Sequence, residues 1–238
     1  MTINPELMNP EPIHPEPMSR ESMNPEPMNL EQVNPGPVMI AVSGVKNSGK
    51  TTLITRLIPI LHSRGLKVAT IKHDGHDFEP DIPGTDSDRH RRAGACGTAV
   101  FSANRWMVVH EGPPDDVEAI ARCFPEADLI LLEGFKYSPY PKIEVIRRGN
   151  SAGSVCDPGS LLAVVTDLGE EELQSTLPES VQILDLNDIE RIAGIIYDAW
   201  QKMRKAEAGE RHGRGNQSPA GGRAEWGSSS GSESAEML

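Results

Sequence analysis

MIAVSGVKNSGKTTLIT, at residues 39–55, is the stretch that decides the fold. Its apolar start, Met39–Val42, predicts a buried strand, and the segment Gly44–Thr51 fits the pattern G-x-x-x-x-G-K-[ST] at every fixed position. Apolar residues then recur at helical spacing, at Leu53, Leu57, Ile58 and Leu61. A strand, a glycine-rich loop and a helix in this order predict a binding loop for the phosphates of a nucleoside triphosphate.

The glycines and the start of the helix explain why such a loop binds an anion. Gly44 and Gly49 lack a Cβ atom, so the backbone can turn sharply and approach phosphate oxygens closely. The first N–H groups of the following helix, predicted over Lys50–Ser63, point to the same place and carry the positive end of the helix dipole. Lys50 is expected to contact the outer phosphates, and the Thr51 hydroxyl is expected to bind Mg²⁺.

A second informative stretch is ADLILLEGFK, at residues 127–136. Its apolar run ends in Glu133 and then Gly134, which is typical of a buried parallel strand that delivers an acid to one edge of the sheet. In phosphate-loop proteins a carboxylate at that edge holds Mg²⁺, directly or through water, or orients the attacking water. Glu133 is therefore a predicted metal-binding and catalytic residue, with Lys50 as the second catalytic residue.

The rest of the pattern predicts an α/β fold, with a P-loop NTPase-like, mostly parallel sheet flanked by helices. Further strands are expected at residues 66–71, 142–147, 161–165 and 181–184, a hairpin at 98–102 and 106–110, and helices at 87–94, at about 113–124 and from about 189. Thr85 or Asp86 is expected to cap the arginine-rich helix at 87–94.

The two ends of the chain differ in composition from its middle. Residues 1–37 repeat a five-residue Pro- and Glu-rich unit, and residues 206–238 are rich in Gly, Ser, Glu and Arg, so both are expected to be disordered tails around a domain at 38–205. The net charge of −12 argues against binding to nucleic acid or to an anionic membrane. Three cysteines without a C-x-x-C pair, and no apolar run long enough to span a membrane, favour reduced thiols in a cytoplasmic protein.

Four segments in order resemble the MobB family of molybdopterin-guanine dinucleotide biosynthesis adaptors over about residues 38–204. They are GVKNSGKTTL, VATIKHDGHDF, PGTDSDRHRRAGA and ADLILLEGFKYSPYPKIEV. The resemblance implies a GTP-binding protein that uses Mg²⁺, forms a homodimer and hydrolyses GTP weakly. It also implies a partnership with the guanylyltransferase MobA, which joins GMP to the molybdenum-bound pterin, so the protein would be an adaptor in handling molybdopterin rather than the primary catalyst.

The resemblance also implies roles for particular residues. Those that match the phosphate loop of the family are Gly44, Asn47, Ser48, Gly49, Lys50, Thr51 and Thr52. Those that lie on the other matching segments are Glu133, Gly134, His73, Asp74, His76, Asp86 and Arg89. Of these, His73, Asp74 and Asp86 are expected to help bind the nucleotide. A direct role for a histidine at a strand end competes with an ordinary structural role.

The choice of base is not set by these motifs, because the [NT]-K-x-D sequence that reads guanine in many GTPases is absent. Asp167 follows the strand LLAVVT, where a carboxylate would accept hydrogen bonds from the N1 and N2 donors of guanine. The same position suits an aspartate that caps a turn. GTP and ATP therefore both stay open at this stage.

Two other functions compete with a GTP-binding adaptor. A small-molecule kinase also begins with a strand, a phosphate loop and a helix, and the arginines of residues 85–92 would then belong to a mobile lid. A metallochaperone-type GTPase would use histidine and cysteine as metal ligands. His73, His76 and His90 keep that interpretation open, and the absence of paired cysteines counts against it.

Overall fold

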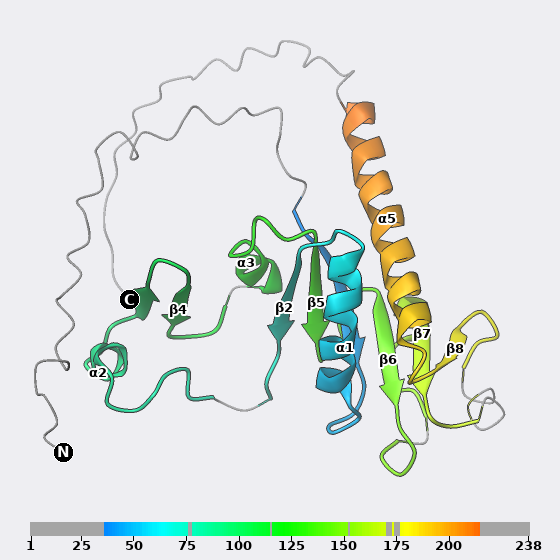
Figure 1. Ribbon diagram of the computed structural model, residues 1–238, viewed down its shortest axis with the longest axis horizontal. Coiled ribbons are helices and arrows are strands. Elements are labelled where there is room, and N and C mark those ends of the chain that lie inside the picture. Colours follow the sequence, from blue (N-terminus) through cyan, green and yellow to red (C-terminus); the bar gives the residue numbers. More distant parts are fainter. Residues whose placement is uncertain are drawn as a thin grey trace, which may run out of the picture. The chain divides into compact units, whose positions relative to one another are not determined.

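A single six-stranded sheet forms the centre of the protein. The computed structural model describes residues 36–75, 78–114, 116–151, 153–169, 173 and 177–214. The strands of this sheet have the spatial order β2-β5-β1-β6-β7-β8, and every adjacent pair is parallel (Figure 1). Their bounds are β1 Val38–Ser43, β2 Val68–Lys72, β5 Leu129–Glu133, β6 Lys142–Ile146, β7 Leu161–Thr166 and β8 Gln182–Asp185. The predicted α/β class with a parallel sheet is confirmed.

The parallel arrangement brings the carboxyl ends of all six strands to one edge of the sheet. The phosphate-loop strand β1 lies between β5 and β6. In the register of the sheet, Val42 of β1 lies opposite Glu133 of β5, and Ser43 lies opposite Glu144 of β6. This edge therefore collects the loops that follow β1, β5, β6 and β7, which is where open α/β sheets bind ligands.

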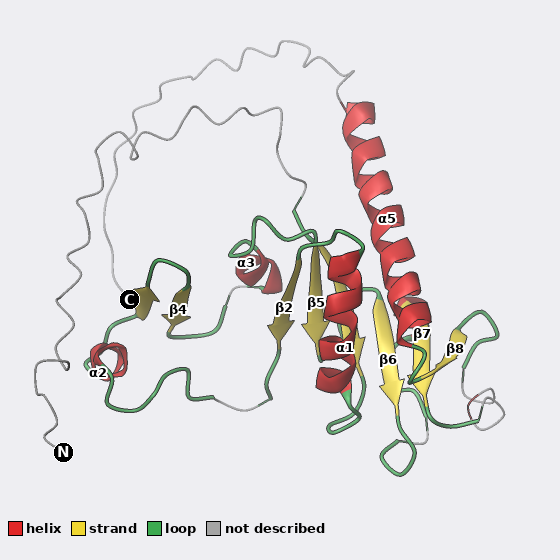
Figure 2. Ribbon diagram, viewed as in Figure 1, coloured by secondary structure: helices red, strands yellow, loops and turns green. Residues whose placement is uncertain are grey.

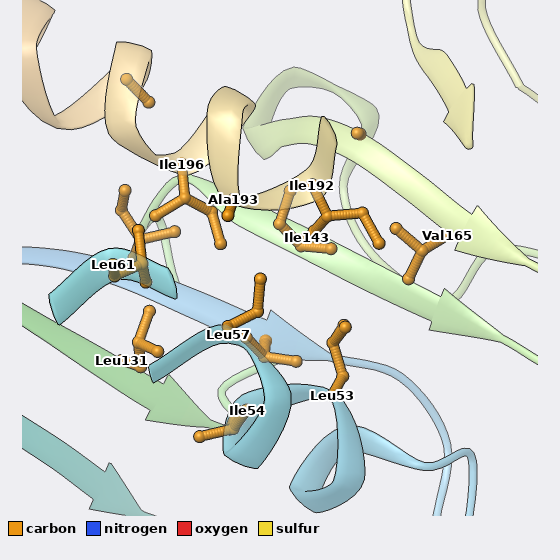
Figure 3. Close-up of a cluster of buried hydrophobic side chains, with 14 of the residues drawn as sticks. Leu53, Ile54, Leu57, Leu61, Leu131, Ile143, Val165, Ile192, Ala193 and Ile196 are labelled. Carbon is orange, nitrogen blue, oxygen red and sulfur yellow. The ribbon is translucent and has the colours of Figure 1, made fainter. Parts of the chain in front are cut away.

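Two long helices cover one face of the sheet. Helix α1 spans Lys50–Ser63 as predicted, and α5 spans Ile189–Arg214. Figure 2 shows both helices in front of the strands. Their apolar faces meet in one core with strand residues, and Figure 3 shows side chains of α1, α5 and β5–β7 pointing toward one another. The labelled members of this core are Leu53, Ile54, Leu57, Leu61, Leu131, Ile143, Val165, Ile192, Ala193 and Ile196.

The opposite face of the sheet has two smaller apolar clusters. One packs the short helix α3, Val117–Ala121, against Ile71, Ile130 and Leu132. The other joins Leu173 and Leu177 to β6 and β7. Helix α3 is shorter than the predicted span of about 113–124 at both ends. It begins later because Asp116 caps it by accepting a hydrogen bond from the Ala119 N–H at 2.6 Å, and it ends at Ala121 with Arg122 as its C-cap.

A hairpin and a short helix lie between β2 and β5 in the chain. The hairpin pairs β3, Gly97–Phe101, with β4, Trp106–His110, in antiparallel register, which confirms the prediction. Helix α2 spans Asp86–Arg92, close to the predicted 87–94, and its cap is the Thr85 side chain, one of the two caps predicted. Several apolar side chains of the hairpin are exposed, including Phe101 at 83% and Trp106 at 61%. A remaining element, η4, is the 3-10 turn Pro158–Ser160.

The C-terminal boundary of the domain differs from the predicted one. Helix α5 continues to Arg214, so the boundary predicted at 205 lies inside it, because Lys, Ala and Glu dominate residues 202–208 and favour helix. Residues 215–238 and most of the 1–37 segment lie outside the described residues, as does His76, so the predicted tails stay predictions. In the part of the chain that is described, none of the helices has the length and apolar character needed to cross a membrane.

Candidate phosphate-binding site

The loop between β1 and α1 has a backbone shape that requires glycine. Gly44 has a φ of +134° and Gly49 a φ of +98°, and Asn47 also has a positive φ, of 62°. A Cβ atom on Gly44 would lie 2.5 Å from the carbonyl oxygen of Val145, which is far closer than two such atoms can approach. The loop can therefore pack against β6 only with glycine at this position.

The start of α1 is available to an anion. Gly49 occupies the N-cap, and no side chain caps the helix among the described residues. The Ser48 hydroxyl is fully buried in the same loop and has no hydrogen-bond partner in the described part of the protein. An uncapped N-terminus on a 14-residue helix, beside a buried unpaired hydroxyl, fits a ligand with several acceptor oxygens, such as a phosphate chain.

Lys50 is held inside the loop by backbone acceptors. Its Nζ donates to the carbonyl oxygens of Val45 at 2.6 Å and Gly44 at 3.4 Å. Burial lowers the pKa of Lys50 from its ordinary value, and the nearby Glu133 carboxylate acts in the opposite direction. The ammonium group thus already lies over the loop, where a phosphate group would compete with two carbonyl oxygens for it.

The predicted metal-binding residues are in direct contact. The Thr51 Oγ1 donates to the Glu133 Oε1 at 2.7 Å, across 82 positions of sequence. A hydroxyl and a carboxylate oxygen are ligands that suit Mg²⁺, which takes oxygen atoms and keeps several waters. Thr51 is the second residue of α1, so Thr51 and Glu133 would hold such a cation beside the start of that helix. Thr52 is the next residue of the helix and is exposed.

A fully buried lysine that the sequence analysis did not select holds the loop after Glu133. Lys142 is 0% exposed, and its Nζ lies among three carbonyl oxygens. It donates to Ser138 at 2.6 Å and, more weakly, to Lys136 at 3.3 Å and Phe135 at 3.4 Å. The turn itself is tight, since Gly134 has a φ of +103° and Phe135 a φ of +51°. Lys142 therefore fixes the segment that follows the predicted metal-binding carboxylate.

A second buried charge on β6 fixes another loop of the same edge. Glu144 is 1% exposed and accepts hydrogen bonds from the Ser154 hydroxyl and from the Val155 N–H, the latter at 2.7 Å. Burial and then Glu144 raise the pKa of the neighbouring Cys156 thiol to about 12. Among the described residues Cys96, Cys123 and Cys156 are all free thiols, as expected.

The histidine-rich segment lies beside this site without forming a metal centre. The His73 N–H donates to the Glu133 carbonyl oxygen at 3.1 Å, and its ring stands edge-on to Phe135 with centroids 5.7 Å apart. Asp74 forms an ion pair with Lys72 at 3.7 Å, and both are partly exposed. Within the described residues no three His, Cys, Asp or Glu side chains gather as a metal site.

The arginine-rich helix α2 has contacts of its own. Asp86 is exposed and pairs with Arg89 at 3.6 Å. The carboxylate that matters for local structure is Asp88, which is 2% exposed and accepts hydrogen bonds from the Gly84 N–H, Arg91 and Arg92. The contacts described for Asp86 are thus with its own helix, and they do not place it at the phosphate loop. Sequence reasoning missed Asp88 because nothing in the charge run distinguishes a buried acid from an exposed one.

Asp167 stands at the edge of the phosphate loop together with an arginine. Its Oδ1 accepts a hydrogen bond from the Arg148 N–H at 2.7 Å, and its Oδ2 lies 3.7 Å from the Nε of Arg147. A second guanidinium nitrogen of Arg147, Nη1, lies 3.5 Å from the place that a Cβ on Gly49 would occupy. Arg147 was not selected from the sequence, and only the pairing of β6 with β7 brings it to Asp167.

The sheet order, the glycine-dependent loop and the Thr51–Glu133 contact together define a protein of the P-loop NTPase-like class of α/β folds. Comparison with known proteins gives the family. Residues 39–167 match the family described as MobB, molybdopterin guanine dinucleotide synthesis protein B. Because the match covers more than half of the chain, the chain belongs to the MobB family, as the resemblance of its four segments indicated.

Individual relatives agree with this assignment. The molybdopterin-guanine dinucleotide biosynthesis adapter protein of Escherichia coli (strain K12) is 35% identical over 172 residues, which cover 69% of this chain and 94% of that protein. The protein of the same name from Haemophilus influenzae is 35% identical over 161 residues, covering 66% and 86%. The crystal structure of Bacillus subtilis MobB has a TM-score of 0.51 at 28% identity and covers 66% of this chain and 97% of that one.

Proposed function

We propose that the protein is a GTP-binding adapter in the biosynthesis of molybdopterin guanine dinucleotide, where it assists a MobA-like guanylyltransferase. Its relatives in Escherichia coli and Haemophilus influenzae are named as adapter proteins of this biosynthesis. The observation that carries the nucleotide part of the proposal is the contact of Thr51 with Glu133 beside the uncapped start of α1.

Each part of the site has a distinct task in this proposal. The backbone of Gly44–Gly49, with Asn47 and Ser48, surrounds the phosphates, and Lys50 exchanges its carbonyl partners for phosphate oxygens. Thr51 and Glu133 hold Mg²⁺, which supplies positive charge to the outer phosphates when bound. The ordering of the loop by Lys142 keeps Glu133 in place. His73 and Asp74 border the site on the β2 side.

Hydrolysis in such a site is expected to be slow. Fast phosphoryl transfer to water needs a group that orients the water and a cation that neutralises the transition state. Lys50 and Glu133 are the catalytic residues of the proposal, and no glutamine stands in the phosphate loop or in the segment 127–140. We therefore expect turnover on the order of 10⁻⁴ to 10⁻² per second without a partner. Binding, more than turnover, would be the useful event.

The proposal includes a homodimer. The β3–β4 hairpin exposes Phe101 and Trp106, and an isolated two-stranded hairpin is marginally stable in water. Exposed apolar surface of this kind marks association sites in soluble proteins. A second copy of the chain would cover it, which sedimentation equilibrium tests directly: a monomer at micromolar concentration would refute this part of the proposal.

The kinase interpretation loses support from the contacts of α2. A lid would need free arginines, but Arg91 contacts Glu79, Asp88 and Glu111, and Arg92 contacts Asp88. Arg89 pairs with Asp86. The metallochaperone interpretation lacks a ligand cluster among the described residues. The GTP-binding adapter is therefore the function that the site and the family support best.

Equilibrium competition of GTP against ATP, with Mg²⁺ present, tests the proposal. We expect a clear preference for GTP, and loss of binding in Lys50→Ala with an unchanged melting temperature. Lys46→Ala is the matched control, because Lys46 is an exposed lysine of the same loop at a variable position of the motif, and only its backbone is proposed to face the phosphates. Preference for ATP, or equal loss in both variants, would refute the proposed site. Deletion of residues 1–37 should leave nucleotide affinity unchanged.

The adapter role needs a separate experiment. Purified protein loaded with GTP should bind a molybdenum cofactor guanylyltransferase and raise its yield of the guanine dinucleotide. Lys50→Ala should lose this effect, whereas Lys46→Ala should keep it. A stimulation that is the same in Lys50→Ala would show that nucleotide binding is not part of the adapter function.

A further inference from the structure

Two charged residues directly follow neighbouring strands and lie side by side at the edge of the sheet that carries the phosphate loop. In the register of β6 with β7, Ile146 lies opposite Thr166. The next residues, Arg147 and Asp167, therefore leave the sheet together, and they form an ion pair between Nε and Oδ2 at 3.7 Å. Arg147 also reaches over Gly49, the N-cap of α1. A cation and an anion thus stand next to the place where the nucleotide is proposed to bind.

This ion pair can open at little cost. Its distance of 3.7 Å is too long for a hydrogen bond, and the side chains are 50% and 37% exposed. Exposed ion pairs contribute only about 0–1 kcal/mol. Asp167 is nevertheless oriented, because its Oδ1 accepts the Arg148 N–H at 2.7 Å. Each carboxylate oxygen has two lone pairs, so both oxygens can still accept hydrogen bonds from a ligand.

The chemistry of the pair matches the edge of guanine. Guanine presents two acceptors, N7 and O6, followed by two donors, the N1 and N2 hydrogens. An arginine pairs with the acceptors, and a carboxylate pairs with the donors. Adenine presents a donor at the position of O6 and an acceptor at N1, so it would meet like groups at both places. An adjacent arginine and aspartate therefore favour guanine over adenine at two positions, because each of the two side chains matches guanine and mismatches adenine.

We propose that Arg147 and Asp167 together select the guanine base, with Asp167 accepting from N1 and N2 and Arg147 donating to O6 and N7. The inference rests on the proposed function, in which a guanine nucleotide occupies the phosphate loop. It gives this chain a base-reading pair in place of the missing [NT]-K-x-D sequence. The pair comes from the residues that directly follow two neighbouring strands, β6 and β7, whereas that sequence takes its lysine and aspartate from one loop.

Competition binding with GTP, ATP and XTP tests this assignment. Asp167→Asn keeps the oxygen that accepts the Arg148 N–H, so the loop should stay folded. Its amide donates to the C2 oxygen of xanthine but repels the N2 donors of guanine. We expect affinity for GTP to fall about tenfold or more, and affinity for XTP to rise. Asp116→Asn is the matched control, because Asp116 is an exposed aspartate that also accepts one backbone N–H.

Variants of Arg147 distinguish a contact of this residue with the base from a contact with the phosphates. Arg147→Ala should lower affinity for GTP and leave affinity for ATP unchanged, and Arg147→Lys should restore it only in part, because lysine lacks the planar pair of donors. Equal losses for GTP and ATP would mean that Arg147 contacts phosphate, which overturns its assignment to the base. If the unsubstituted protein prefers GTP but Asp167→Asn keeps that preference and gains no XTP affinity, this inference fails and the proposed function stands. If the unsubstituted protein lacks a GTP preference, both fail.

Discussion

A methyl group added to Gly44 should cost much more stability than one added to a glycine with open space around it. In Gly44→Ala the new Cβ would lie 2.5 Å from the Val145 carbonyl oxygen and 3.0 Å from the Ser48 Oγ. Ordinary contact begins at 3.4 Å, so the loop and β6 must move apart by about 0.9 Å. Both neighbours of the clash are buried, and the carbonyl belongs to a central strand.

Gly65→Ala is the matched control for this substitution. Gly65 has a φ of +88° with nothing within 4 Å of the Cβ position, so alanine there meets backbone strain without a clash. A strained backbone costs about 1–3 kcal/mol at either site. Overpacking adds about 1–3 kcal/mol at Gly44 alone. The unfolded-state gain of Gly→Ala, about 0.4–1 kcal/mol, is shared by both variants and cancels in the comparison.

Urea and thermal unfolding measure this difference. Gly44→Ala should unfold with about 1–3 kcal/mol less free energy than Gly65→Ala. That corresponds to a melting temperature about 2–12 °C lower for a domain of this size. Gly44→Ala should also lose triphosphate binding, while Gly65→Ala keeps it. Equal stability of the two variants, with binding retained in both, would refute the reasoning that this glycine is required by the close approach of the loop to β6.

Three further predictions follow from the site and its surroundings. Thr51→Val removes an exposed hydroxyl, so stability should change by less than about 1 kcal/mol, while the gain in nucleotide affinity on adding Mg²⁺ disappears in a titration with and without the metal. The pKa of Asp88 is held below its ordinary value, first by the Gly84 N–H and also by Arg92, with burial acting in the opposite direction. The stabilising effect of the Asp88 carboxylate is therefore complete above about pH 4 and is lost as pH falls through the lowered pKa. Amide hydrogen exchange in α2, measured at a series of pH values, should show this loss of protection, and the Asp88→Asn variant should not show the pH dependence. Because burial and Glu144 raise the pKa of Cys156 to about 12, alkylation at neutral pH should modify the two exposed cysteines and spare Cys156 until the protein unfolds.

Local sequence patterns were sufficient to predict the elements that carry the site. The phosphate-loop pattern placed α1 at Lys50–Ser63, where the structure has it. The apolar run before Glu133 predicted a buried parallel strand, and the structure pairs that strand with β1. The contact between Thr51 and Glu133 follows from these two predictions, because neighbouring parallel strands end at the same edge.

The residues that the sequence did not disclose depend on contacts between distant segments. Lys142 opens the alternating stretch KIEVI, where a lysine suggests a solvated face, yet it is fully buried among carbonyl oxygens of the loop after Glu133. Arg147 and Asp167 are separated by 20 positions, and only the register of β6 and β7 brings them together. The pairing register of two strands that are distant in the sequence cannot be predicted from the local pattern of either strand.

The buried polar residues at the sheet edge indicate a site that is ordered before its ligand arrives. Lys142 holds the loop after β5, and Glu144 holds the loop at residues 154–155. Ser43, at the end of β1, donates its hydroxyl to the Gly134 carbonyl oxygen. A buried charge is costly to place unless it is satisfied. Here Lys142 is satisfied by main-chain carbonyl oxygens, and Glu144 by one main-chain N–H and the Ser154 hydroxyl. Lys142→Met keeps the length of the side chain but removes these donors, so it should loosen the loop more than it weakens the core. A preordered site loses little conformational entropy when it binds a ligand, which favours tight retention of a nucleotide over rapid turnover. Such a site suits the proposed role, in which the protein holds GTP for a partner.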